Sequence, residues 1–413
     1  MPKSQILSDR ELFQLTGPFQ LDGYSKDRAL ELVGAACLSM LVEPGDRMAG
    51  ALSKNLGNTI FLNLLIDGLQ TSQVLAELNN SESLTTVREE FGDLESTISD
   101  SRQRWLPRLS KSRLVHLFSQ SAALGLGLVT PSDSNWPRGL DDLQHSAPAM
   151  LFVEGSPLVL ANLQQAVSIV GSRASTEYGK QVTHHLVRHL AEGKRSTVSG
   201  GAVGIDAHAH QSSIDNDIPT IAVMAGGLDR KYPKSNSAMF RNIELHGAVI
   251  SELPPGVAPT RWRFLQRNRL IAALTPTTVV IEAGVRSGSI RTANNALELD
   301  RELYAVPGSV LSSTSAGTNS LIADGKALAL HDLSVFASAH VLVPPKIIET
   351  ALAKRAHDAI RELGYPTRTE VARGAGLTDA ELSIALLELS KANQLIDGRS
   401  SDGQVHYALR YGH

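Results

Sequence analysis

Residues 165–335 alternate between short runs of β-branched and aliphatic residues and segments with helical spacing, and this alternation constrains the fold most strongly. The runs predicted as strands are 167–170, 197–198, 220–224, 248–250, 278–281 and 303–306. Most of them lead through glycine or proline into a predicted helix. Continuous apolar strands separated by helices are typical of a parallel sheet covered on both faces. We therefore predict an α/β fold in which ligands bind at the carboxyl ends of the strands.

The rest of the chain predicts two further domains, as a length of 413 residues allows. Residues 1–125 show helical spacing of apolar residues and predict a helical N-terminal domain, followed by the sheet domain at 126–340. Residues 345–413 follow a Pro-Pro break and predict three helices and a β-hairpin, which is a winged-helix pattern. A capping box at Thr378 and Glu381 marks the start of the third helix.

Composition limits the class of protein. The formal net charge of -3 shows no global excess of positive charge, so any surface for nucleic acid must be local. The single cysteine, Cys37, excludes an intramolecular disulfide and fits a reducing compartment. No run approaches the roughly 18 apolar residues of a membrane span, and the N-terminus does not resemble a signal peptide. We therefore expect a cytoplasmic protein with no membrane partner.

A glycine turn, Gly171-Ser172-Arg173, directly follows the first predicted strand and precedes a helix whose predicted N-cap is Ser175. A glycine, a hydroxyl and a guanidinium at the positive end of a helix dipole suit a phosphate. A glycine after a strand is also often only a turn, so this motif alone leaves both interpretations open. It matches neither G-x-x-x-x-G-K-[ST] nor G-x-G-x-x-G, which argues against ATP hydrolysis and NAD binding. We expect no cofactor.

Two further strand ends repeat this glycine pattern. Their residues are Ser199, Gly200 and Gly201, then Gly226 and Gly227. Three such ends in succession predict a continuous groove along which a phosphate backbone can lie close to the chain. Asp206 could contact a base edge, but a carboxylate interacting with the start of its own helix is favoured. His208 and His210 are two residues apart and diverge on a helix, so no metal site is expected.

A local basic segment lies at residues 260–269. It contains four arginines and two aromatic residues, and no acid: Arg261, Arg263, Arg267, Arg269, Trp262 and Phe264. Aromatic rings interleaved with arginines favour single-stranded nucleic acid, because bases stack on rings while guanidinium groups pair with phosphates. The alternative is that the aromatic residues face the core and the arginines are structural. Arg230 and Lys231, after the third glycine turn, would extend the same positive surface.

A second hydroxyl-rich helix start follows the fifth predicted strand. It contains Ser287, Gly288, Ser289 and Thr292 and predicts another anion site. Glu282 is the carboxylate best placed for general acid or base chemistry, although a structural or ligand-positioning role is favoured. No histidine or cysteine with nucleophile spacing accompanies it. We therefore expect no catalytic residues and no enzyme activity.

Together these motifs resemble the DNA-processing protein A family (DprA, also called Smf). The resemblance runs from about residue 130 to residue 336 and also includes Asn268 of the basic segment and the Tyr232-Pro233, Ser251-Glu252 and Val306-Pro307-Gly308 motifs. It implies an extended Rossmann-like sheet domain that binds single-stranded DNA without hydrolysing nucleotide. It also implies a homodimer that helps to load the RecA recombinase during natural transformation, and a C-terminal winged helix. The resemblance assigns the DNA groove to Arg173, Phe264, Arg267 and Arg269.

Two alternatives remain open. A phosphoribohydrolase of the LOG type could use Glu282 on a nucleoside monophosphate, although the strand end is Glu-Ala-Gly rather than Pro-Gly-Gly-x-Gly-Thr. A scaffold with an unused groove is disfavoured, because four clustered arginines would repel one another without compensation.

In the C-terminal domain, the third predicted helix carries three acidic residues, Asp379, Glu381 and Glu388, and one basic residue, Lys391, so it suits phosphate poorly. We predict that residues 345–413 act mainly as a protein-contact or regulatory module.

Overall fold

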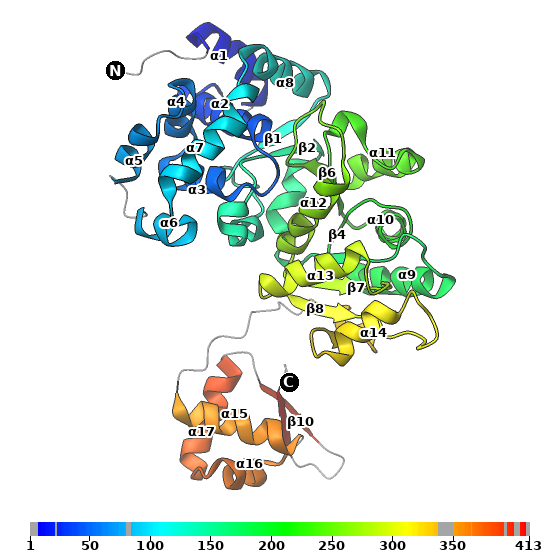
Figure 1. Ribbon diagram of the computed structural model, residues 1–413. Coiled ribbons are helices and arrows are strands. Elements are labelled where there is room, and N and C mark those ends of the chain that lie inside the picture. The colour runs from blue at the N-terminus through cyan, green and yellow to red at the C-terminus, as the bar shows by residue number, and fades with distance from the viewer. Residues whose placement is uncertain are drawn as a thin grey trace. The chain divides into compact units, whose positions relative to one another are not determined.

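The computed structural model describes residues 7–20, 23–79, 84–337, 350–364, 366–391, 395–399 and 405–409. The chain forms two compact units, Met1–Ala339 and His340–His413. The first unit contains both the helical N-terminal region and the sheet (Figure 1).

The N-terminal region is helical, as predicted. Its α-helices are α1 (Asp9–Thr16), α2 (Lys26–Leu41), α3 (Arg47–Leu56), α4 (Asn58–Ile66), α5 (Thr71–Asn79), α6 (Leu84–Phe91), α7 (Leu94–Trp105) and α8 (Lys111–Ala123), with short 3₁₀ turns η1 (Gly17–Phe19) and η2 (Leu106–Arg108). Ser25, Asp46 and Ser110 cap the starts of α2, α3 and α8 with their side chains. The apolar faces of these helices share one core with Phe152 and Phe240 of the sheet region. The helices therefore pack on the sheet rather than forming a core of their own.

The sheet has nine strands. They are β1 (Gly127–Val129), β2 (Leu151–Gly155), β3 (Val167–Val170), β4 (Thr197–Ser199), β5 (Thr220–Val223), β6 (Ala248–Ser251), β7 (Thr277–Val280), β8 (Glu302–Ala305) and β9 (Leu328–Ala329), in the order β1-β2-β6-β5-β4-β3-β7-β8-β9. Neighbours from β6 to β9 are parallel, whereas β1 and β2 add an antiparallel edge. Each predicted run overlaps a strand, so the predicted α/β Rossmann-like class is confirmed.

Helices cover both faces of the sheet because its central strands are apolar on both sides. They are α9 (Glu177–Glu192), α10 (Ile205–Asp215), α11 (Ser237–His246), α12 (Arg261–Leu274), α13 (Gly288–Glu298) and α14 (Ala316–Ala323), with 3₁₀ segments η3 (Arg138–Ser146), η4 (Pro157–Gln165), η5 (Leu228–Arg230), η6 (Lys234–Asn236) and η7 (Leu333–Phe336). In β3, Val167 and Ile169 pack in the core that contains apolar residues of α9 and α10. Val170 packs in the opposite core, with apolar residues of α12 and α13. This alternation is the period of two expected of a strand.

Strand β3 marks the point where the strand order reverses. It pairs with β4 on one side and with β7 on the other, so the chain first proceeds toward β6 and later toward β9. In parallel sheets the loops that leave such a point diverge and leave a crevice at the carboxyl ends of the strands. Gly171-Ser172-Arg173 lies in the loop that follows β3, and the loop that follows β7 ends at Ser287, which directly precedes Gly288 and Ser289 at the start of α13.

The C-terminal unit contains α15 (Ala351–Leu363), α16 (Arg368–Ala375), α17 (Asp379–Lys391) and the antiparallel strands β10 (Leu395–Arg399) and β11 (Val405–Leu409). Ile360, Leu382 and Leu389 lie in its core. The predicted capping box is present, since Thr378 N donates to Glu381 Oε2 over 2.8 Å and Glu381 N donates to the Thr378 hydroxyl over 3.3 Å. Three helices and a strand pair were predicted here. The hairpin turn lies largely outside the described residues, and the winged-helix assignment stays a prediction.

Candidate functional site

A cleft of about 880 Å³ lies at the point of strand-order reversal. Its walls come from the loop after β3, the first half of α12 and the start of α13. The predicted site residues that line it are Gly171, Ser172, Arg173, Arg261, Phe264, Arg267, Asn268, Ser287, Gly288, Ser289 and Thr292. The structure thus brings together predicted residues from three separate parts of the sequence.

Phe264 lies at the centre of a cluster of rings and guanidinium groups. The Arg173 Cζ lies 5.7 Å and the Arg267 Cζ 5.9 Å from the centre of the Phe264 ring. The ring of Tyr232 meets Phe264 edge to face, with centroids 5.7 Å apart. Phe264 is partly exposed and Tyr232 is 50% exposed. The cleft therefore offers aromatic surface directly beside positive charge, as base stacking with phosphate pairing requires.

Arg267 forms the positively charged floor of the cleft. It is 6% exposed, and its Nη1 donates to the carbonyl oxygens of Gly200, over 2.8 Å, and of Val223. Burial lowers its pKa to about 10, so the group stays charged at neutral pH. Its buried Nε has no hydrogen-bond partner in the described part of the chain. A Cβ at Gly200 would lie 2.6–2.8 Å from this guanidinium, which explains the glycine there.

The backbone amides after β4 are not free for a phosphate. Asp206, in the first turn of α10, accepts hydrogen bonds from Gly200 N over 3.2 Å and Ala202 N over 3.4 Å. Burial raises the pKa of this carboxyl group, which is 7% exposed. A protein carboxylate thus occupies the amides that would otherwise hold a nucleotide phosphate. The predicted cradle at Ser199, Gly200 and Gly201 needs correction, because Ser199 is also buried and its hydroxyl donates to Ile169 O over 2.6 Å.

The start of α13 forms the facing wall. Ser287 caps the helix by accepting from Ile290 N, and Ser289 Oγ donates to Gly171 O over 2.8 Å, joining the two walls. Asn268 Nδ2 donates to Gly288 O over 3.2 Å. The adjacent Arg286 is exposed and lines the cleft, which sequence reasoning missed. The sequence signal that could have identified Arg286 is its position directly before the Ser287-Gly288-Ser289 motif.

Three exposed arginines of the cleft, Arg173, Arg261 and Arg286, form no ion pair with any described residue. Two other arginines of α12 are neutralised by partners distant in sequence. Arg263 pairs with Glu43 over 3.0 Å, and Arg269, only 8% exposed, pairs with Glu252 through bonds of 2.7 and 2.6 Å. Arg269 therefore lies outside the cleft, contrary to expectation.

Four more predicted residues lie away from the cleft. Lys231 bridges Glu154 and Glu244 over 2.8 Å each, and Arg230 pairs with the neighbouring Asp229. Gly226 and Gly227 pack against the 254–259 loop, where a Cβ would come within 2.8 Å of Pro259 N and 2.5 Å of Pro254 O. These glycines permit close packing of the chain on itself rather than approach of a ligand.

Glu282 has a structural role. It is 1% exposed and accepts from Thr176 N over 2.9 Å and from the Thr176 hydroxyl over 2.6 Å. Thr176, rather than the predicted Ser175, is the N-cap of α9. With both oxygens engaged below the surface, Glu282 is unsuited to act on a nucleotide, and the phosphoribohydrolase alternative is not favoured. Among the described residues, no group of histidine, cysteine and carboxylate side chains could hold a metal ion.

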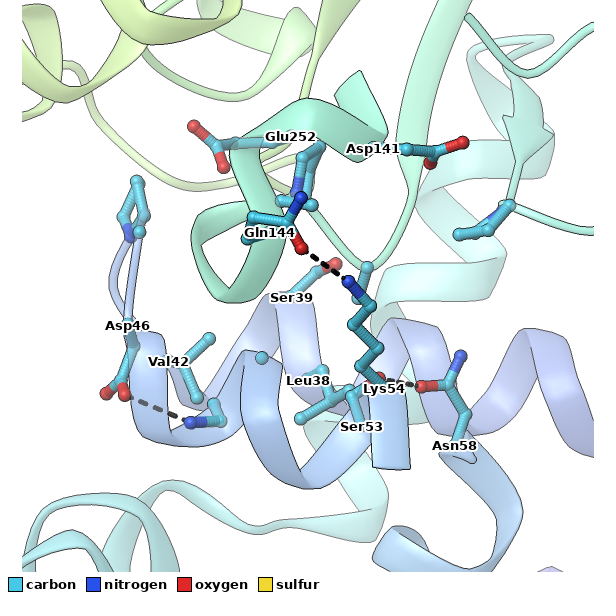
Figure 2. A pocket seen from close by; sticks show the side chains of 18 of the residues that line it. Leu38, Ser39, Val42, Asp46, Ser53, Lys54, Asn58, Asp141, Gln144 and Glu252 are labelled. Carbon is cyan, nitrogen blue, oxygen red and sulfur yellow. Dashed lines mark hydrogen bonds between the residues drawn. The ribbon is translucent and has the colours of Figure 1, made fainter. Parts of the chain in front are cut away.

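A second hollow, of about 540 Å³, lies between α2, α3 and the η3 segment (Figure 2). Its single lysine, Lys54, extends to Gln144, with 2.7 Å between Nζ and Oε1. Its carboxylates outnumber this cation: Glu31, Glu43, Asp46, Asp141 and Glu252. This hollow is therefore poorly suited to nucleic acid, and the cleft at β3 is the candidate site.

The sheet region of the chain matches a known protein family. Residues 127–339 match the family model described as DNA recombination-mediator protein A. This chain belongs to that family. It is 39% identical over 295 residues to a putative DNA processing protein DprA of Mycobacterium tuberculosis, covering 66% of this chain and 76% of the relative. It is 37% identical over 201 residues to DNA processing protein DprA of Bacillus subtilis, covering 49% and 67% respectively.

A solved structure supports the same assignment. DNA processing protein A of Streptococcus pneumoniae aligns with a TM-score of 0.53 and 30% identity, over 69% of this chain and 96% of that one. The family match therefore covers the sheet domain that carries the cleft. No helix of the described part of the chain is long and apolar enough to cross a membrane.

Proposed function

We propose that the cleft at β3 binds the backbone of single-stranded DNA. The observation that carries this proposal is the set of three exposed, unpaired arginines, Arg173, Arg261 and Arg286, around the partly exposed ring of Phe264. Guanidinium groups pair with phosphates, and a ring beside them stacks on a base. Duplex DNA presents its bases already stacked and paired, so Phe264 could not be used. A free nucleotide is disfavoured because Asp206 occupies the backbone amides.

We further propose that the protein acts as a recombination mediator rather than as an enzyme. The matching family model carries that description, and the relatives in Mycobacterium tuberculosis and Bacillus subtilis are named DNA processing proteins. In this proposal the protein protects incoming DNA during natural transformation, helps to load RecA and works as a homodimer. The C-terminal unit contacts protein, because the first turn of α17 is acidic. These roles rest on the family resemblance.

Binding of a labelled oligonucleotide across a salt series tests the proposal. Arg173→Ala, Arg261→Ala and Arg286→Ala each remove one phosphate partner, so the slope of log K against log salt should flatten by about 0.7 per variant. Phe264→Ala should weaken binding by roughly 1–3 kcal/mol, the usual value of one stacked base, with less change in slope.

Arg230→Ala is the matched control. Arg230 is an exposed arginine whose own partner, Asp229, already balances its charge, and it lies outside the cleft. Its replacement should leave both affinity and slope unchanged. Equal affinity in the wild type and in all four cleft variants would reject the site.

A further inference from the structure

Trp262 is an exposed tryptophan that the cleft does not use. It is 55% exposed, whereas Trp105 and Trp136 are 2% and 1% exposed. Exposing so large a ring forgoes the stabilisation that burial would provide, and such rings are common where a ligand or partner binds. Trp262 lies in the first turn of α12, beside Arg261.

Helix geometry separates Trp262 from the cleft. Residues two apart on an α-helix point about 200° away from each other. Phe264 lines the cleft, whereas Trp262 and Gln266, one turn apart, line a different recess of about 400 Å³. The far wall of this recess comes from the N-terminal helical region. The two aromatic residues of the basic segment, two positions apart in the sequence, therefore line two different surfaces.

Two arginines reach the recess from the N-terminal helical region. Arg104 and Arg108 reach it from the end of α7 and from η2, with side chains 60% and 42% exposed. Glu43 also lines it, but Arg263 already holds both of its oxygens at 3.0 Å, so Arg108, at 3.3 Å, is a secondary partner.

Asp46, the second carboxylate of the recess, is also engaged. It accepts from Ala49 N over 3.2 Å and Trp105 Nε1 over 3.1 Å, and lies 3.8 Å from Arg104. Arg104 and Arg108 are the two arginines of the recess lining, and both of its carboxylates also have partners that do not line the recess with them, Arg263 for Glu43 and Ala49 N for Asp46. Arg104 also donates to Ser101 Oγ over 3.1 Å and Arg108 to Leu41 O over 3.2 Å, and both side chains remain exposed to solvent over part of their surface.

We propose that the single strand held in the cleft continues past Arg261 and across the start of α12 into this recess. There a base stacks on Trp262, and Arg104 and Arg108 contact phosphates. The inference rests on the proposed function, and continuity supports it, because Arg261 lines the cleft and the next residue lines the recess. The positive end of the α12 dipole lies on this path and favours the backbone. The N-terminal helical region then becomes part of the DNA-binding surface.

Tryptophan emission tests this directly. The sequence contains three tryptophans, and the other two are buried, so quenching by an added oligonucleotide reports on Trp262. The probes are oligothymidylates of about 5 and about 16 nucleotides, which bracket the site sizes common among single-strand binders. We expect the longer probe to quench the emission and to protect Trp262 from acrylamide.

Trp262→Leu should abolish the quenching and weaken binding of the longer probe by about five- to 150-fold, the effect of one lost stacked base. Arg104→Ala should weaken it in a salt-dependent way. Phe13→Leu is the matched control, since Phe13 is 54% exposed in the same helical region and lies outside the recess. This inference is overturned if Trp262→Leu binds the longer probe with full affinity and the probe leaves the emission of the wild type unchanged. If Arg173→Ala still weakens binding in that case, the proposal for the cleft is unaffected. Failure of the wild type to bind either probe overturns both.

Discussion

Replacing Arg269 by alanine should destabilise the fold without removing a DNA contact. Arg269 and Glu252 are 9% and 8% exposed in their side chains and share bonds of 2.7 and 2.6 Å. Arg269 also donates to Ser146 O over 3.2 Å and Gln266 O over 3.1 Å. Removing one partner of a buried pair leaves the other charge desolvated and uncompensated, which costs about 3–5 kcal/mol. We therefore expect the free energy of unfolding to fall by that amount in Arg269→Ala.

Urea denaturation followed by the emission of the buried Trp105 and Trp136 measures this loss. Arg261→Ala, on the same helix but exposed and unpaired, should change stability by less than about 0.5 kcal/mol. The double variant Arg269→Met with Glu252→Gln should recover much of the loss, because no buried charge remains. If Arg269→Ala is as stable as the wild type and flattens the salt dependence of DNA binding as Arg173→Ala does, Arg269 contacts DNA and the prediction is wrong.

Three further predictions follow from the structure. Gly200→Ala places a Cβ within 2.8 Å of the Arg267 guanidinium, so it should lower stability by roughly 1–3 kcal/mol and also weaken DNA binding. In Gly288→Ala the nearest atom to the added Cβ is 4.0 Å away, so this variant should have a normal thermal melt. Burial, and then the charge of Arg267, lowers the pKa of His210 from 6.5 to about 3. Because only the unfolded chain takes up this proton, stability should fall as pH drops from 6.5 toward 3, by up to about 1.4 kcal/mol per unit, and His210→Gln should flatten that dependence in urea titrations at several pH values. Deleting residues 340–413, a separate compact unit, should leave most of the single-strand affinity, and its loss would refute a protein-contact role for that unit.

The sheet could be predicted from sequence because its signal is local. Each predicted run overlaps a strand, and the parallel arrangement followed from the intervening helices. The edge strand β9 (Leu328–Ala329) has only two residues and gave no comparable signal. The strand order, and hence the position of the cleft beside β3, depends on packing between distant segments and was visible only in the structure.

The central residues of the site could be predicted from the sequence, but which of the surrounding arginines line the cleft could not. Arg173 and Phe264 were identified from their own motifs, and the structure places them together. Arg269 pairs with Glu252 and Arg263 pairs with Glu43, whereas Arg261 has no carboxylate partner among the described residues. No local pattern in the sequence relates these two carboxylates to the basic segment. The functional value of an arginine depends on whether folding gives it a carboxylate partner, which residue type and spacing do not reveal.

The measurement that tests the central claim most directly compares wild-type binding of single-stranded and duplex DNA of equal length across a salt series. The three unpaired arginines of the cleft, at about 0.7 each, predict a slope of log K against log salt of about -2 for a single strand short enough to occupy the cleft alone. Binding of the single strand should be tighter than that of the duplex at each salt concentration, since only unpaired bases can stack on Phe264. Equal or tighter binding of the duplex, or a slope near zero for the single strand, would contradict the account.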